Sequence, residues 1–414
     1  MPDVQFAELA RGGAGADAIA RLVAAQHSKH VILLRGVAEM ARRGDRPDDR
    51  IAVAGWELLA RAQRRDRAAT ERVIRYPSVG TWALRTLHDD QSVPDALPSG
   101  LAAVAAAAAI AAGVDAEIEV PVINGTVVLP SLGAADARGD TAVVRTRTAE
   151  ILSGDLRVTA YPGASGWQDL RRLLAGSFDV LVDDVDPFRM LSTDGEPMGR
   201  LTPTQVARLS AALRDAWDVL DPVSAAEIAA IIQVIVPCQA PESGRFSTSS
   251  PQSFGAIAMS RQPDKYSCAE TLVHETQHLK LCALLELVAL TLPDDGQRYY
   301  APWRTDPRPV SGLLQGAYAF LGVSGFWRGQ RQSVPELPVR RHAQAEFARW
   351  RDGVALVVGT LLDSGRLTEA GQDFVGEMAR VLDAWGKESV PRDALKFAQR
   401  EAQRHLAQWQ ADNG

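Results

Sequence analysis

Three successive patterns of hydrophobic residues divide this chain and limit the folds open to it. From Ala16 to about Ala112, apolar residues recur three and four positions apart, which is the period of an α-helix. Between residues 116 and 182, short runs rich in Val, Ile and Thr are separated by Gly and Asn-Gly, which is typical of antiparallel strands. Helical spacing returns at Thr204. This order predicts a predominantly helical α+β protein.

We expect three regions along the chain. Residues 1–115 form a helical N-terminal bundle, residues 116–200 a β-rich segment that could bind a peptide, and residues 201–414 a mainly helical catalytic domain. The small, mainly antiparallel sheet is expected to use residues 117–123, 126–130, 141–146, 156–161 and 178–182. Late helices are expected over 204–232, 312–327, 339–362, 368–386 and 392–411.

Composition excludes several classes of protein. A net charge of -6 and a pI of about 5.7 provide no basic field to attract nucleic acid or an anionic membrane surface. The most apolar run, Leu101–Gly113, is shorter than the roughly 20 residues that a membrane span needs. The N-terminus lacks the order of a secretory signal. Three scattered cysteines, Cys238, Cys268 and Cys282, indicate a reducing compartment, so we expect a cytoplasmic protein.

A His-Glu-Thr-Gln-His run is the feature that carries chemistry. On a helix, His274 and His278 project from one face about one turn apart and can share a metal ion. Glu275 lies about 100° round the helix, where zinc peptidases hold their general base. A capping box at Ser267–Glu270 predicts the start of this helix, and its end is expected near Leu290. The competing interpretation is a histidine pair on a polar face, which the continuing apolar stripe disfavours.

The sequence does not determine the third metal ligand. The metallopeptidase pattern with a third histidine six residues beyond the second is absent, because that position is Leu284. Glu286 lies two turns from His278, roughly 12 Å along the axis, and is too distant to join the same ion. The remaining candidates lie on later segments and are Gln315, Glu336, His342 and Glu346.

A strand is expected immediately before the metal helix, over residues 254–260. Its small residues leave the backbone little covered, so we expect an edge strand to which an extended peptide can be added by main-chain hydrogen bonds. The substrate contacts would then be Phe254, Gly255, Ala256 and Ile257. A plain core strand fits the same residues equally well.

The loop from Trp303 to Pro309 adds two arginines stiffened by prolines. Arginine forks suit bidentate recognition of carboxylates, so Arg304 or Arg308 could hold an acidic cosubstrate. The alternative is a structural salt bridge to Asp306 or a nearby glutamate.

Together these segments resemble a known family, the HExxH-motif peptide-modification proteins, regarded as iron(II)- and 2-oxoglutarate-dependent peptide β-hydroxylases of ribosomal peptide pathways. The resemblance covers about half the chain and is clearest from Phe246 to Trp327. It implies that His274 and His278 bind iron(II), and it favours 2-oxoglutarate binding by Arg304 or Arg308. The matching segments are Ser253–Ile257, Ala269–His278, Pro302–Pro309 and Gly312–Phe320.

One position departs from the family pattern. Members commonly carry a histidine at the place of Gln315, where it would be a natural third ligand, and glutamine is a weaker, neutral one. The resemblance predicts β-hydroxylation of a residue in a ribosomally made precursor peptide. The alternatives are a zinc metallopeptidase with Glu275 as general base and a non-catalytic relative that only binds peptides.

Overall fold

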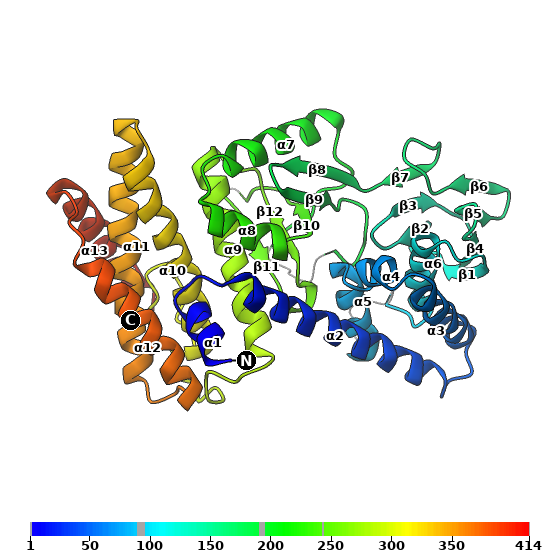
Figure 1. The fold of residues 1–414 in the computed structure, drawn as a ribbon, viewed down its shortest axis with the longest axis horizontal. Coiled ribbons are helices and arrows are strands. Elements are labelled where there is room, and N and C mark those ends of the chain that lie inside the picture. Colours follow the sequence, from blue (N-terminus) through cyan, green and yellow to red (C-terminus); the bar gives the residue numbers. More distant parts are fainter. Residues whose placement is uncertain (1, 89–95, 190–194, 242–243, 414) are drawn as a thin grey trace.

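The N-terminal region is helical, as expected. The structure is a computed structural model that describes residues 2–88, 96–189, 195–241 and 244–413 (Figure 1). The long helix α2 joins two hydrophobic cores, because Ile19 and Leu22 lie in the core of the C-terminal helices whereas Leu34 and Val37 lie in the N-terminal one. The helices of this region are α1 (Asp3–Ala10), α2 (Ala16–Ala41), α3 (Pro47–Arg65), α4 (Arg67–Ile74), α5 (Pro77–His88) and α6 (Gly100–Ala112).

The alanine-rich run forms the buried helix α6. Because alanine side chains are small, α3 can approach the α6 backbone closely at Gly55, where an added Cβ would lie 2.7 Å from the Ala102 nitrogen. The alanine-rich run therefore allows two helices to pack closely inside the N-terminal core. Within the described ranges, no helix combines the length and the apolarity that crossing a membrane would need.

The β-rich segment forms two antiparallel sheets and contributes to a third. The sheets have the strand orders β1-β4-β5-β6 and β2-β3-β7, and their turns use Gly125, Gly139 and Gly154, all with positive φ. The sequence patterns missed β3, β5, β7 and β8. The strands are β1 (Glu117–Pro121), β2 (Thr126–Leu129), β3 (Gly133–Asp136), β4 (Thr141–Arg145), β5 (Glu150–Ser153), β6 (Leu156–Thr159), β7 (Trp167–Asp169), β8 (Arg171–Ala175) and β9 (Phe178–Val182).

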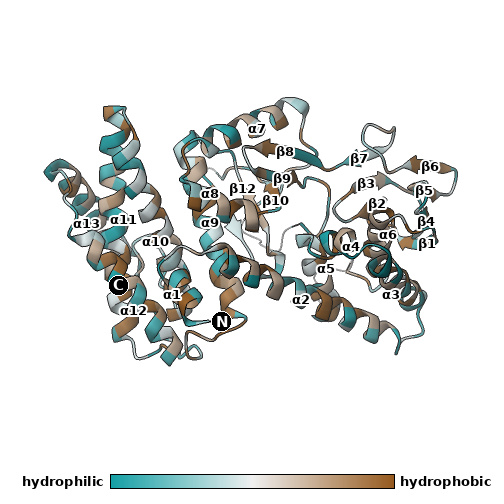
Figure 2. Ribbon diagram, in the orientation of Figure 1, coloured by the Kyte–Doolittle hydropathy of each residue, from teal (hydrophilic) through white to brown (hydrophobic). Residues whose placement is uncertain are grey.

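The third sheet, of order β11-β12-β10-β9-β8, crosses the expected boundary at residue 200, because β9, which also pairs with β8, pairs with β10. Its other members are β10 (Val234–Pro237), β11 (Ser247–Ser249) and β12 (Ala256–Met259). Strand β10 is parallel to both β9 and β12. Its side chains alternate between the two cores, Val234 and Val236 facing one and Ile235 the other, so this hydrophobic strand is buried on both faces (Figure 2).

The predicted edge position of the strand before the metal helix is wrong. Strand β12 lies between β10 and β11, so both of its backbone edges are already paired. The edge strand on this side of the sheet is the short polar β11, and β8 forms the other edge. The hydrophobic patterns did not indicate β11 because it lacks apolar residues.

The C-terminal part is mainly helical: α7, α8 and α10 pack against the motif helix α9, and α11, α12 and α13 pack beyond α10. The expected helix over 204–232 is two helices, because Asp221 caps a second one after a turn. The helix expected over 312–327 runs six residues further, to Ser333, and the other late helices lie within two residues of their predicted bounds. The helices are α7 (Pro203–Trp217), α8 (Pro222–Ile231), α9 (Lys265–Leu285), α10 (Val310–Ser333), α11 (Leu337–Asp363), α12 (Glu369–Gly386) and α13 (Arg392–Asn413).

Both predicted ends of α9 need correction. The helix is capped by Asp264, whose carboxylate accepts hydrogen bonds from the backbone nitrogens of Tyr266 and Ser267, so it starts before the predicted capping box. It ends at Leu285, because the following chain bonds to a distant segment: Leu292 N donates to the Arg366 carbonyl oxygen. This tertiary pairing overrides the local helical pattern.

Candidate functional site

Helix α9 brings the two motif histidines together. The His274 and His278 Nε2 atoms lie 3.1 Å apart, and both rings are partly buried. An ion bound to both nitrogens at roughly 2.1 Å, with an angle of 90–109° between the bonds, would separate them by about 3.0–3.4 Å. The separation therefore fits a shared divalent ion, and it is also the distance of a hydrogen bond between the two rings when one of these nitrogens carries a proton.

The surroundings keep His274 in the form that binds metals. Burial, and to a lesser degree the neighbouring His278, hold the pKa of His274 well below its ordinary value. The imidazole is therefore neutral near pH 7, as a metal ligand must be. The Phe320 ring packs edge-on against His274 at 5.0 Å, and it contacts Trp303 at 4.8 Å and Trp350 at 4.3 Å. These three rings form an aromatic wall beside the histidine.

Gln315 lies beside His278, but not at the nitrogen that faces His274. Its Oε1 is 3.1 Å from His278 Nδ1, so that ring nitrogen donates and Nε2 keeps its lone pair for an ion. The Gln315 Nε2 contacts Cys282 Sγ at 3.5 Å. Burial raises the pKa of Cys282 to about 11, so its thiol stays protonated at neutral pH. In this arrangement the Gln315 oxygen is bonded to the far nitrogen of His278 and is not directed at the two Nε2 atoms that face each other.

The other third-ligand candidates are not gathered at the histidines. Glu336 and His342 are exposed, and Glu346 is buried near Arg349, with 3.9 Å between the charged atoms. Over the ranges that the structure describes, no three His, Cys, Asp or Glu side chains are grouped so that they could hold a metal ion. Among the described residues, the candidate metal ligands that lie together are therefore the two histidine nitrogens.

Glu275 is anchored to the edge strand. It is 2% exposed, and its Oε1 and Oε2 accept hydrogen bonds from Ser247 Oγ and Ser249 Oγ, each at 2.7 Å. Residues two apart on a strand face the same side, so both hydroxyls reach α9. This alternation in Ser247-Thr248-Ser249 is the signal that could have identified the partners of Glu275 from sequence.

The predicted substrate contacts lie inside the protein. Phe254, Ala256 and Ile257 are at most 4% exposed, and Gly255 has a φ of +93° at the turn into β12. None of the four presents an open edge to a peptide, because β10 and β11 flank the strand. The core-strand interpretation of these residues is the one that the structure supports.

The arginine loop is near the histidines only through Trp303. Arg304 Nε and Arg308 Nη1 donate to the two oxygens of Asp306, at 2.8 and 2.9 Å. The Arg304 side chain is 53% exposed and that of Arg308 is 36% exposed, so each keeps donors that solvent or a ligand can reach. The salt bridge considered from the sequence is present.

Comparison with known proteins did not assign the chain to a family. No protein-family model matches the chain, and no curated protein matches it. The resemblance to the peptide-modification proteins therefore stays a prediction.

Proposed function

We propose that this protein is a metal-dependent, peptide-modifying enzyme, and specifically an iron(II)- and 2-oxoglutarate-dependent hydroxylase of a residue's β-carbon in a ribosomally made precursor peptide. The proposal that the protein binds a metal rests on the 3.1 Å separation of the His274 and His278 Nε2 atoms. The choice of iron and 2-oxoglutarate rests on the resemblance of residues 246–327.

Each residue has a role under this proposal. His274 and His278 would hold the ion, and Gln315 would fix the orientation and tautomer of His278. When bound, iron(II) supplies oxidative chemistry with dioxygen and the keto acid. The wall of Phe320, Trp303 and Trp350 would limit water at the reacting carbon.

The peptide would bind along β11. This strand ends the five-stranded sheet among the described strands, and its serines contact Glu275 in the motif. An extended peptide added to this edge would be held by main-chain hydrogen bonds close to the metal helix. The role of Glu275 is then to fasten the edge strand to α9.

The burial of Glu275 favours hydroxylation over proteolysis. In a zinc peptidase this carboxylate would have to take a proton from a metal-bound water. Here both of its oxygens already accept serine hydroxyls, and the group is 2% exposed. The hydroxylase requires no proton transfer to it.

Anaerobic addition of iron(II) and 2-oxoglutarate tests the proposal. We expect a weak visible charge-transfer band that needs both additions and disappears in His274→Ala. His342→Ala is the matched control, because that histidine is exposed and separate from the pair. Tight zinc binding with peptide cleavage and no band would instead identify a peptidase. Failure to bind either metal would identify a non-catalytic relative.

The arginines provide a second test. We expect Arg304→Ala or Arg308→Ala to raise the 2-oxoglutarate concentration needed for the band by roughly 10-fold, on the order of one lost charged hydrogen bond. Asp306→Ala, which frees both arginines, should leave binding intact. If neither arginine variant changes the requirement, the two residues serve only their salt bridge.

A further inference from the structure

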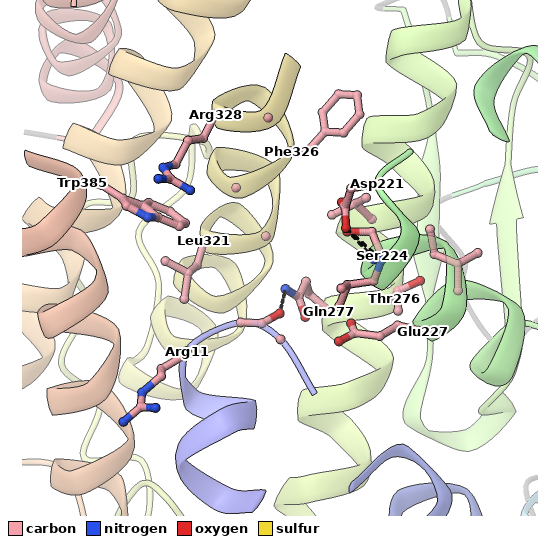
Figure 3. Close-up of a pocket in the computed structure, with 18 residues that line it drawn as sticks. Arg11, Asp221, Ser224, Glu227, Thr276, Gln277, Leu321, Phe326, Arg328 and Trp385 are labelled. Atoms are coloured by element: carbon pink, nitrogen blue, oxygen red, sulfur yellow. Dashed lines mark hydrogen bonds between the residues drawn. The ribbon is translucent and has the colours of Figure 1, made fainter. Parts of the chain in front are cut away.

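A cavity of about 310 Å³ lies on the other side of α9 from the histidines. At 100° per residue, Thr276 lies opposite the His274–His278 face, and Val273 and Gln277, which also line the cavity, lie roughly 120° and 80° round the helix from it. The remaining walls come from the start of α8, the middle of α10, Trp385 of α12 and the linker between α1 and α2 (Figure 3). Its volume is at the lower end of the roughly 300–1,000 Å³ of small-molecule sites.

Glycines on α10 keep this space open. Gly325 and Gly329 both line the cavity, and a glycine inside a helix costs roughly 0.5–1 kcal/mol relative to alanine. Packing does not require either of them: a Cβ on Gly325 would meet Trp385 only at 3.5 Å, and one on Gly329 would meet nothing within 4 Å. Because they have no side chains, the two glycines leave space beside the α10 backbone.

Charged side chains stand on two sides of the cavity. Arg11 and Arg328 lie with Trp385 on one side, whereas Asp221 and Glu227 of the α8 segment lie on the other (Figure 3). Glu227 is already paired with Lys280 Nζ at 2.6 Å, so Asp221 is the acidic group on that side that has no cationic partner among the described residues. Each arginine uses its Nε for one carboxylate, Arg11 for Glu377 at 2.9 Å and Arg328 for Glu388 at 2.6 Å. Because a guanidinium has five N–H donors, both keep further donors for an anion.

Gln277 closes one wall of the cavity. It is 3% exposed, and its Nε2 donates to the Gly12 carbonyl oxygen at 2.7 Å, which fastens the linker between α1 and α2 to α9. Leu321, Phe326 and Val273 provide apolar surface for a ligand.

We propose that this cavity binds a small zwitterion of amino-acid size with an apolar side chain. The carboxylate would lie on the side of Arg11 and Arg328, the ammonium toward Asp221, and the side chain among the apolar residues. The site is separate from the histidine pair, so its test does not depend on any metal or on the proposed hydroxylase activity.

Binding of L-phenylalanine to the full chain, measured by ligand-observed NMR titration, tests the site. Two analogues each lack one charge: 3-phenylpropionate has no ammonium and 2-phenylethylamine has no carboxylate. We expect L-phenylalanine to bind, and each analogue to bind with an affinity at least about 10-fold lower. This is the loss expected when one charge-assisted contact is removed. Equal binding of all three, or no binding of L-phenylalanine, would overturn the proposal.

Filling variants locate the binding. Gly325→Leu places a side chain in the cavity and should abolish binding. Gly359→Leu on α11, where an added Cβ has no atom within 4 Å, should leave binding unchanged. If Gly325→Leu does not fold, Gly329→Leu replaces it. Asp221→Asn keeps the α8 cap but removes its charge, and should weaken only the ligands that carry an ammonium. Binding that survives both filling variants would refute the assignment.

Discussion

Replacing Gln315 by leucine would test how the protein holds His278. The side chain is similar in size, but it cannot accept the 3.1 Å hydrogen bond from His278 Nδ1. Loss of a partner behind a metal-binding histidine typically lowers metal affinity by about 10–100-fold. The amide is neutral and makes a single contact here, so we expect the lower end, about 10-fold or 1.4 kcal/mol. A carboxylate accepts more strongly, so Gln315→Glu should bind metal at least as tightly as the wild type.

Competition titrations of zinc and cobalt(II) against a chromogenic chelator measure these affinities directly. X-ray absorption of the zinc-bound proteins would count the bound imidazoles, and we expect two in the wild type and in Gln315→Leu. An affinity that is unchanged in Gln315→Leu would refute the orienting role. A loss far beyond 100-fold, with one oxygen ligand fewer in the absorption spectrum, would show instead that Gln315 binds the ion.

Three further predictions concern stability. Burial raises the pKa of Glu270 to about 7 from an ordinary 4.5, so the charged form of its carboxyl is disfavoured in the folded state. The free energy of unfolding should therefore fall as pH rises from about 4.5 to 7. Urea unfolding at a series of pH values measures this fall, which Glu270→Gln should reduce. Lys280→Met leaves the buried Glu227 without its 2.6 Å partner and should cost about 3–5 kcal/mol in chemical unfolding, whereas replacing both residues by apolar ones should cost less. Gly55→Ala should lower the thermal midpoint because its Cβ would strike the α6 backbone, while Gly359→Ala, in open space, should raise it slightly; equal shifts would contradict the packing argument.

The buried ion pair also explains how the N-terminus is held. Lys280 Nζ and Gln277 Nε2 both donate to the Gly12 carbonyl, at 2.9 and 2.7 Å, and the Ala14 nitrogen donates to Glu227 at 2.5 Å. The linker between α1 and α2 is thus bound by α8 and α9, about 215 to 270 residues away in sequence. No local pattern could predict these contacts, because each partner is unremarkable in its own segment.

The sequence by itself determined the class of fold and the helical placement of the histidine pair. Hydrophobic periodicity acts through local backbone geometry, so most helices and the longer strands could be read from it, and a four-residue spacing puts His274 and His278 on one face of α9. Only the tertiary structure decided which strand forms the sheet edge, how Glu275 is bonded, and where Gln315 points. Strand order and these side-chain partners depend on pairings between segments far apart in the chain, which local propensity does not encode.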